Sequence, residues 1–425
     1  MIDIKIIREY PDLVKAAIAN KNEKDRVDEL LSLDEERRKI IVEVEELKAK
    51  RNNVSSQIPQ MKKAGEDSTA VLAEMKEVSD QITELDSALK KIENELNEIL
   101  LFIPNLPHES VPVGKTDDDN VEVRSWTPEG FNIKSDKKFL DHIELGKKLN
   151  ILDFERGAKV SGSGFPVYIG KGATLERALL NFMLDYHLSK HGYSEVLTPF
   201  LVNSDSMRGT GQLPKMEEDM YYISKDNLYT IPTAEVPITN LHRKEVLSES
   251  ELPKKYVGYS ACFRREAGSY GKEAKGFLRV HQFNKVEMVN FAKPETSYDE
   301  LESLVIDAED ILKALKIPYR VRLLCSGDLS FSAAKCYDIE TWSPAEKKWL
   351  EVSSCSNFGD FQARRANIKF KRDGEKKAEF IHTLNGSGLA TSRLMVSLLE
   401  IYQTDSGTIE VPEVLQKYTR FTIIN

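Results

Sequence analysis

The sequence lacks the features that mark a membrane, secreted or zinc-binding protein. No apolar run in its 425 residues approaches the about 20 residues that a membrane span needs. The first residues, MIDIKIIREYPDLV, lack the charged and apolar regions of a secretory signal. The four cysteines form no C-x-x-C pair, so they predict reduced, mostly buried thiols and no zinc site. We therefore expect a cytoplasmic protein with no membrane partner.

The common phosphate-binding loops are missing as well. The stretch GFPVYIGKG is similar to a P-loop, but five residues separate Gly164 from Gly170 where the motif has four. Gly172 also stands where the motif needs Ser or Thr. No G-x-G-x-x-G follows a strand pattern and opens a helix. The alternating segments of the chain favour an antiparallel sheet over a parallel, doubly wound one.

A basic excess is absent too, because the net charge is −9 at pH 7. That value argues against a general polyanion binder, so a nucleic-acid partner would need a local basic patch. With 40% hydrophobic and 30% charged residues, the composition is that of a soluble globular protein. The length allows two or three domains and a large core.

Two long helices are predicted over about residues 28–102. In the second, apolar residues recur at alternating steps of four and three, which is an uninterrupted heptad pattern: Val71, Met75, Val78, Ile82, Leu85, Leu89, Ile92, Leu96 and Ile99. The first repeats it less regularly, at Leu30, Leu33, Ile40, Val44, Leu47 and Val54, with Arg37 and Arg51 intruding. The polar stretch QMKKAGEDST between them suits a reversal at Gly65. We predict an antiparallel hairpin, a coiled coil within one chain.

Two questions about this hairpin stay open: whether it mediates dimerisation, and what its basic clusters contact. Most sustained heptads mediate dimerisation, although the reversal makes this pattern self-sufficient within one chain. The hairpin also carries the basic clusters ERRK and KAKR and the pair Lys62-Lys63 near its tip. Acidic residues are interleaved with them, so the clusters indicate either a nucleic-acid contact or a solvated helix face.

A domain boundary is predicted in the stretch FIPNLPHESVPVG, whose three prolines and glycine end the helical pattern. We assign residues 1–110 to an N-terminal helical domain and residues 111–425 to a second domain. The second domain mixes short helices and strands with many turns and shows no internal repeat.

The stretch FRREAGSYGKEAKGFLRVHQFNKVEM, residues 263–288, carries the clearest chemical pattern. Two alternating segments flank a glycine-bearing loop, and the second predicts a strand from Arg279 to Phe291. Arg264 and Glu266 share one face of the first, as Phe283 and Glu287 do of the second. Coinciding faces would suit a purine nucleotide, with a ring for the base, a carboxylate for its amino group and a guanidinium for phosphate. The alternative is an exposed strand face with ion pairs.

The same stretch resembles motif 2 of class II aminoacyl-tRNA synthetases, in the form of the seryl-tRNA synthetase family. GYSEVLTPFLV resembles motif 1, with Pro199 at its dimer interface, and NGSGLATSRLMVSLLE resembles motif 3, with Arg393 as its arginine. GTGQLPKM, TIPTAEVPITNL and WLEVSSCSNFGDFQARR match further family stretches in order, so the resemblance covers nearly the whole chain. The motif 2 loop GKEAKG and Lys417 depart from the usual residues, and neither touches a proposed contact.

The resemblance implies an α+β fold, in which helices flank a six- to seven-stranded antiparallel class II sheet and a long helical hairpin forms the N-terminus. It implies that serine attacks the α-phosphate of ATP, giving seryl-adenylate and pyrophosphate, and that the seryl group then passes to tRNA(Ser). The expected protein is a homodimer whose hairpin reaches the long variable arm of the tRNA. The resemblance leaves tRNA(Sec) open as a further substrate.

The resemblance also implies roles by position. Arg264 and Arg393 are the catalytic residues, and Mg²⁺ bound to the phosphates is held by Glu351 and Ser354. ATP contacts fall on Arg264, Arg265, Glu266, Val280, Phe283, Glu351, Val352, Ser353, Ser354 and Arg393. Serine contacts fall on Thr233, Ala234, Glu235, Arg264, Glu287, Asn385 and Ser387. For the paired carboxylates we favour recognition of ammonium and hydroxyl over acid–base catalysis, because the attacking carboxylate of serine is already ionised.

Three other functions stay open. A related ligase that charges a carrier protein would not need the intact hairpin. Another class II synthetase, such as one for threonine, would leave the hairpin unexplained and lacks its zinc-ligand spacing here. A non-enzymatic coiled-coil RNA-binding scaffold predicts that the pocket residues have decayed, whereas all of them are present. Serine-dependent ATP–pyrophosphate exchange, followed by transfer to tRNA, separates these functions.

Overall fold

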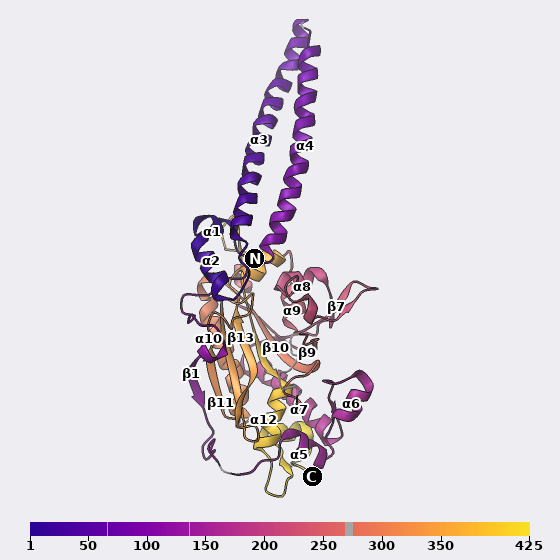
Figure 1. Ribbon diagram of the computed structural model, residues 1–425, viewed down its shortest axis with the longest axis vertical. Coiled ribbons are helices and arrows are strands. Elements are labelled where there is room, and N and C mark those ends of the chain that lie inside the picture. The colour runs from indigo at the N-terminus through magenta and orange to yellow at the C-terminus, as the bar shows by residue number, and fades with distance from the viewer. Residues whose placement is uncertain (66, 136, 268–274) are drawn as a thin grey trace. The chain divides into compact units, whose positions relative to one another are not determined.

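The computed structural model describes residues 1–65, 67–135, 137–267 and 275–425. It divides into two compact units (Figure 1). One contains residues 2–19 and 23–104, and the other contains Met1, residues 20–22 and residues 105–425. We refer to them as the helical unit and the sheet unit.

The helical unit contains the predicted hairpin. Its elements are α1 (Ile4–Glu9), α2 (Pro11–Asn20), α3 (Val27–Ala64) and α4 (Thr69–Leu100). The two long helices run side by side (Figure 1), and the chain reverses near Gly65, whose φ of 72° suits a residue without a side chain. The heptad positions face inward, because Met75, Val78 and Ile82 are buried and pack against Leu47 and Val54. The predicted hairpin and its seam are confirmed.

Many basic residues of the hairpin are paired with carboxylates of the same unit. Asp34 is fully buried and forms ion pairs with Arg8, Arg37 and Arg38, at 2.8, 3.4 and 3.2 Å. In the KAKR cluster two lysines are paired, Lys48 with Asp86 and Lys50 with Glu74. The side chain of Lys62 lies outside the described residues. These pairs favour the solvated-face interpretation for a large part of the basic clusters, and they weaken any nucleic-acid contact that rests on those residues.

The sheet unit is built on a sheet of eight strands. In spatial order these are β1 (Val121–Trp126), β11 (Tyr319–Leu323), β12 (Lys335–Ser343), β13 (Lys348–Asn357), β16 (His382–Ala390), β10 (Gln282–Ala292), β9 (Lys254–Phe263) and β4 (Ser194–Glu195). All neighbours are antiparallel except β4 and β9, which are parallel. The sheet confirms the α+β class, with the two-residue edge strand β4 adding to the six or seven strands expected.

Helices and small sheets surround this sheet. The helices are α5 (His142–Lys148), α6 (Phe154–Ser161), α7 (Lys171–Lys190), α8 (Ser204–Thr210), α9 (Glu235–Asn240), α10 (Ser297–Ala314), α11 (Phe361–Ala366), α12 (Thr391–Ile401) and α13 (Glu413–Thr419). The small sheets pair β2 (Leu152–Asp153) with β3 (Val167–Tyr168), β5 (Leu201–Asn203) with β7 (Leu228–Thr230) and β6 (Tyr222–Ile223), β8 (Val246–Ser248) with β14 (Lys369–Lys371) and β15 (Ala378–Phe380), and β17 (Ile409–Glu410) with β18 (Ile423–Ile424).

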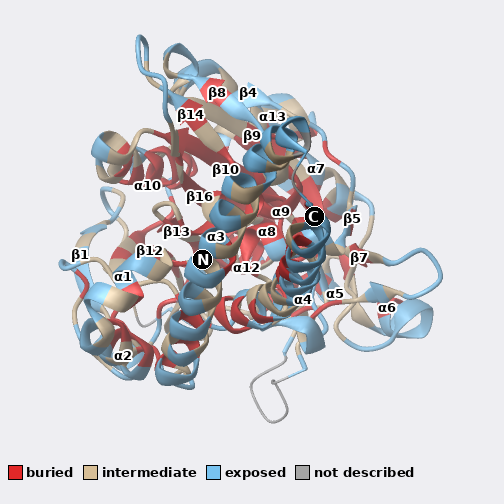
Figure 2. Cartoon of the chain, turned by 90° about the horizontal axis from the view of Figure 1, so that it is seen from above, coloured by how far each residue is buried: buried red, intermediate tan, exposed pale blue. Residues whose placement is uncertain are grey.

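The main core lies between the sheet and the helices α7, α10 and α12. Buried residues, drawn red in Figure 2, gather on β10 and β16, and the three helices add further buried residues to this core. On β10, Val286 and Met288 belong to this core and have no exposed surface. Because side chains alternate along a strand, Lys285 and Glu287 point to the opposite side of the sheet. Both faces of β10 are therefore buried, one in apolar core and the other in a polar site.

Two sequence predictions about the motif 2 strands are wrong in detail. The second strand begins at Gln282 and not at Arg279, because the preceding residues form turns, with a positive φ at Gly276 and a bond from the Leu278 N–H to the Lys275 carbonyl. The first strand ends at Phe263. Neither Arg264 nor Glu266 is therefore part of it.

The four cysteines are free and buried, as predicted. Among the described residues, no helix combines the length and the apolar character needed to cross a membrane.

Candidate active site

Strand β10 lies between β9 and β16, and one of its faces is polar. Glu287 stands opposite Gly258 on β9 and opposite Ser387 on β16. The pairing with β16 is irregular here, since Lys285 stands opposite Ala390 and β16 carries one extra residue between Ser387 and Ala390. Such an irregularity re-aims side chains locally and is common beside active sites.

Glu287 is completely buried, so its charge needs partners. Its Oε2 accepts a hydrogen bond from the Thr233 hydroxyl at 3.1 Å and forms an ion pair with the Lys285 ammonium. Its Oε1 accepts from the Asn385 amide at 2.9 Å. The structure thus brings together Thr233, Glu287 and Asn385, three of the residues expected to contact serine.

A second buried carboxylate, Glu235, stands beside the first. Its oxygens accept from the Gln362 amide at 2.6 Å and from Asn385 at 3.1 Å, so one amide bridges both carboxylates. Burial, and then the charge of Glu287, raises the pKa of Glu235 to about 7. Glu235 is therefore poised between its charged and neutral forms near neutral pH.

Lys285 and Gln362 are parts of this site that the sequence predictions missed. Lys285 is 5% exposed, and its ammonium donates to the Thr233 hydroxyl at 2.9 Å, in addition to its pair with Glu287. A signal for it existed, because Lys285 shares the alternating face of Phe283 and Glu287. Gln362 lies within the matched stretch FGDFQARR, but no local pattern marked its side chain.

Two other residues predicted to contact serine, Ala234 and Ser387, are buried as well. Ala234 is buried in an apolar cluster, so only its main chain can meet a ligand. Ser387 is also buried, and its carbonyl accepts a hydrogen bond from the Ser353 hydroxyl at 2.6 Å.

A cavity of about 240 Å³ lies along β10 at its N-terminal end. Its aromatic walls are Phe283, Phe165, Tyr168 and Phe277. The Arg264 guanidinium lies over the Phe283 ring, 5.2 Å from its centre, and its Nε donates to the Pro232 carbonyl at 3.4 Å. Arg264 therefore stands between the aromatic cavity and the segment that carries Thr233.

Arg265 and Glu266 follow the end of β9, so their side chains do not lie where the alternation of a continuing strand would place them. Glu266 has a left-handed φ of 53° and pairs with Arg279 at 2.5 Å. The main-chain N–H of Arg265 donates to the Asp219 carbonyl, and its guanidinium donates to the Glu218 carbonyl. The motif 2 loop, residues 268–274, lies outside the described residues.

Arg393 lies in the first turn of α12 and joins three segments of the site. Its Nε donates to the Leu278 carbonyl at 3.1 Å, and its Nη1 lies 3.2 Å from both the carbonyl and the carboxylate of Glu351. The arginine is two-thirds buried, which leaves part of its guanidinium open to a ligand.

Strand β13 borders β16 in the sheet. Val352 and Ser353 are buried, as is Val280 before β10, so these residues can offer ATP main-chain contacts only. Glu351 remains exposed.

Ser354 stands opposite Asp338 on β12. Desolvation, and then the charge of Glu351, raises the pKa of Asp338 well above its usual range. A cation beside Glu351, Asp338 and Ser354 would relieve this repulsion, so the donor set fits a hard divalent ion.

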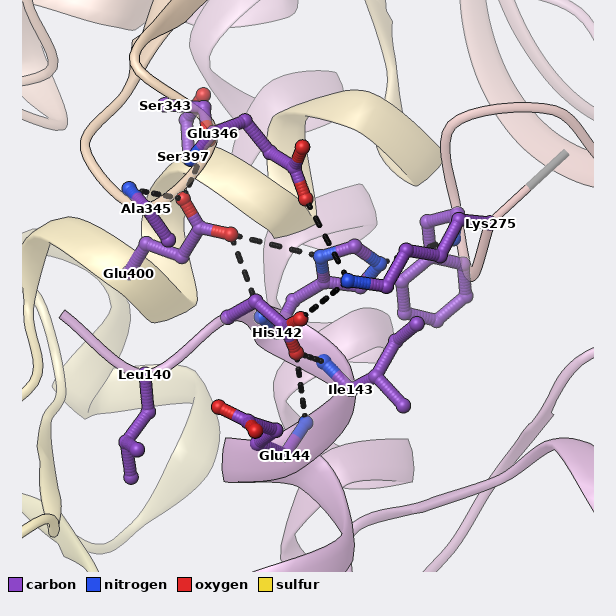
Figure 3. A network of polar contacts seen from close by, with 12 residues as sticks. Leu140, His142, Ile143, Glu144, Lys275, Ser343, Ala345, Glu346, Ser397 and Glu400 are labelled. Carbon is purple, nitrogen blue, oxygen red and sulfur yellow. Dashed lines mark hydrogen bonds and ion pairs between the residues drawn. The ribbon is translucent and has the colours of Figure 1, made fainter. Parts of the chain in front are cut away.

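A network of polar contacts anchors the chain directly after residue 274 (Figure 3). The His142 ring is fully buried, and its Nε2 accepts from the Phe277 N–H at 3.1 Å. Its Nδ1 therefore carries the ring proton and faces Glu400 at 3.4 Å. Lys275 pairs with Asp141 at 2.6 Å. The network holds Phe277 in the wall of the cavity. No pattern in the sequence predicted that His142 would bind the main chain there.

Comparison with known proteins identifies the family. The family model described as "Seryl-tRNA synthetase N-terminal domain" matches residues 1–107. The family model described as "tRNA synthetase class II core domain (G, H, P, S and T)" matches residues 219–402. The chain is 61% identical to the serine–tRNA ligase of Chloroherpeton thalassium, over the whole length of both.

Two crystal structures superpose on the whole chain. Seryl-tRNA synthetase from Pyrococcus horikoshii, complexed with ATP, gives a TM-score of 0.94 at 39% identity and is covered over 99% of its length. The cytoplasmic enzyme of Naegleria fowleri, in complex with AMP, gives 0.88 at 33% identity, also over 99%. With buried carboxylates beside an aromatic cavity on an antiparallel sheet, and relatives that match it from end to end, the chain belongs to the seryl-tRNA synthetase family of class II aminoacyl-tRNA synthetases.

Proposed function

We propose that the protein is a serine–tRNA ligase that forms seryl-adenylate from serine and ATP and then charges tRNA(Ser). The observation that carries the proposal is the pair of buried carboxylates, Glu235 and Glu287, joined to Thr233 beside the aromatic cavity. A small polar substrate with an ammonium and a hydroxyl suits this pocket, because a ligand without these groups leaves buried polar atoms unpaired.

The first step needs alignment more than covalent chemistry. The serine ammonium binds at Glu287 and the Thr233 hydroxyl, with Glu235 beside them. Arg264 forks between the serine carboxylate and the α-phosphate. This arginine is placed for that role because it lies between the Pro232 carbonyl and the Phe283 ring. A planar fork holds two anions in fixed geometry and neutralises charge that develops on phosphorus.

The adenine end of ATP is assigned to the aromatic cavity. Phe283 stacks on the base, and Glu266 accepts from its amino group. Because Glu266 already pairs with Arg279, adenine must share that carboxylate. Arg393 holds the phosphates from the start of α12, where the helix N-terminus adds further positive potential.

Mg²⁺ fits beside Glu351 and Ser354, and we add Asp338 to this set. Among the residues that the structure describes, no cluster of three or more acidic, His or Cys side chains could hold a metal by itself. Mg²⁺ commonly uses one or two carboxylates and takes its other ligands from phosphates and water. When bound, it neutralises charge on the ATP phosphates.

Catalysis and tRNA recognition are assigned to different units. Every residue assigned to serine, ATP or Mg²⁺ lies in the sheet unit, while the hairpin offers a rigid surface for the backbone and shape of tRNA. We assign residues 1–110 to tRNA recognition and residues 111–425 to catalysis. The four reduced thiols suit activity in the cytoplasm.

A homodimer is proposed from the outer edge of the sheet. Strand β4 ends the sheet order, and the nearby Leu197 side chain is 80% exposed in the single chain. Pro199, two residues further along the chain, is also exposed. An open strand edge beside a large apolar side chain is a surface that a second copy of the chain would cover.

Pyrophosphate exchange in the presence of serine, threonine or alanine tests the function. Serine alone should support rapid exchange, and the seryl group should then pass to a transcript of tRNA(Ser). A transcript of tRNA(Sec) belongs in the same assay as a second candidate acceptor. Exchange with serine but transfer only to a carrier protein would favour the carrier-protein ligase, and no exchange with serine would refute the proposal.

A further inference from the structure

The Lys285 ammonium occupies the place in the pocket where the ammonium of a bound substrate is expected. Its Nζ contacts the Glu287 carboxylate and lies 2.9 Å from the Thr233 hydroxyl. Those are two of the groups assigned to serine recognition. The lysine is 5% exposed, so this is a desolvated, specific position and not a flexible surface pair.

The hydrogen bonds of Thr233 leave no room for a further partner. A hydroxyl has one proton to donate and two lone pairs to accept with. The Thr233 proton goes to Glu287 at 3.1 Å, and its lone pairs accept from Lys285 and from the Glu235 main-chain N–H at 3.1 Å. A ligand reaches this hydroxyl only if one of these three partners leaves.

Lys285 is the partner that can leave. The Glu235 N–H belongs to the backbone at the start of α9, and the bond to Glu287 joins two side chains of the site itself. The lysine ammonium, by contrast, sits at the end of four flexible methylene groups. A ligand ammonium that replaces it offers the same charge and the same donors to Glu287 and Thr233.

We propose that Lys285 is an internal substitute for the substrate ammonium: it neutralises Glu287 in the empty pocket and is displaced from Thr233 when serine binds. The inference rests on the proposed function of the pocket as the serine site. It makes Lys285 a specificity residue, because a ligand without an ammonium cannot displace the lysine and so cannot reach Thr233.

Chemical rescue tests the competition directly. In Lys285→Ala, ethylammonium should refill the vacated position, and L-serine should compete with it. The apparent Kd of L-serine, measured by calorimetry without ATP, should double when ethylammonium reaches its own Kd. If lysine and serine instead occupy the pocket together, ethylammonium will tighten serine binding, which would overturn the proposal. Sodium chloride at equal ionic strength controls for salt.

A matched control and a second measurement guard against indirect effects. Lys255→Ala removes a lysine on the adjacent strand that pairs with Glu300, and ethylammonium should leave its serine affinity unchanged. If Lys285→Ala does not fold or takes up no ethylammonium, a crystal structure of the wild-type protein with L-serine decides. If the Lys285 ammonium is still hydrogen-bonded to the Thr233 hydroxyl in that structure, the proposal is overturned. If the ammonium has moved away from this hydroxyl, the proposal is supported. Failure of wild-type protein to bind L-serine would refute the proposed function instead.

Discussion

Glu235 should make serine binding depend on pH around neutrality. Its carboxylate is buried, and burial together with the charge of Glu287 raises its pKa to about 7. The ionised form attracts the ammonium of serine, whereas the neutral form does not. Serine should therefore bind more tightly as the pH rises through 7.

The magnitude follows from the ionised fraction. With a pKa of about 7, roughly 9% of Glu235 is ionised at pH 6 and roughly 91% at pH 8. If the ionised form alone binds serine well, the apparent Kd equals the intrinsic Kd divided by that fraction. The affinity for serine should then rise about tenfold between pH 6 and pH 8.

Calorimetric titration of L-serine at several pH values in this range measures the effect. Glu235→Gln should flatten the profile, because the amide does not titrate. Glu245→Gln is the matched control, since Glu245 is exposed, pairs with His242 and lies outside the pocket. A flat wild-type profile, or a slope that survives in Glu235→Gln, would refute the assignment of Glu235 to the serine ammonium.

The same raised pKa has a consequence for stability. Between the ordinary value of 4.5 and about 7, the folded protein holds a proton on Glu235 that the unfolded chain releases. The contribution of this group to the free energy of unfolding therefore falls as the pH rises through that window, by up to about 3 kcal/mol. Urea unfolding of wild type and Glu235→Gln at pH 5 and pH 8 measures the difference.

Three other changes test separate parts of the site and fold. Glu287→Gln should weaken serine binding by about 30- to 1000-fold, or about 2–4 kcal/mol, while ATP binding changes little; equal losses would make Glu287 structural. Deletion of residues 27–101 should spare pyrophosphate exchange but abolish transfer to tRNA, and parallel loss of both would contradict the modular assignment. His142→Ala should release Phe277 and raise the KM for ATP roughly 2- to 10-fold with an unchanged KM for serine, and an unchanged KM for ATP would separate His142 from the cavity.

The sequence predicted best where one periodicity dominates over a long stretch. The heptad positions from Val71 to Ile99 predicted α4 and its buried face, because a four-three spacing fits one side of a helix over many turns. The antiparallel sheet also followed from alternation, whereas alternation left open whether the strand face of Glu287 was buried or exposed. These features depend on local repetition, which a single sequence displays directly.

The ends of the motif 2 strands were predicted less well, for a physical reason. Alternation continues past Phe263 in the sequence, but the main-chain N–H of Arg265 bonds to the Asp219 carbonyl and the chain turns at Glu266. Likewise the N–H of His281 bonds to Gly164 before β10 begins. Partners that lie far away in the sequence therefore end both strands, and neither partner belongs to the pattern that predicted them.

Charge compensation inside the pocket was the least predictable feature, and it changes how the site discriminates. Alternation placed Lys285 beside Glu287 on one face, yet it could not show that the ammonium shares Thr233 with it. An empty pocket with two buried carboxylates and no cation would be costly, so the fold requires an internal partner. That partner must be of the same chemical kind as the substrate group, because both satisfy the same acceptors. Neutralisation of the empty site and selection for an ammonium are thus two results of one arrangement.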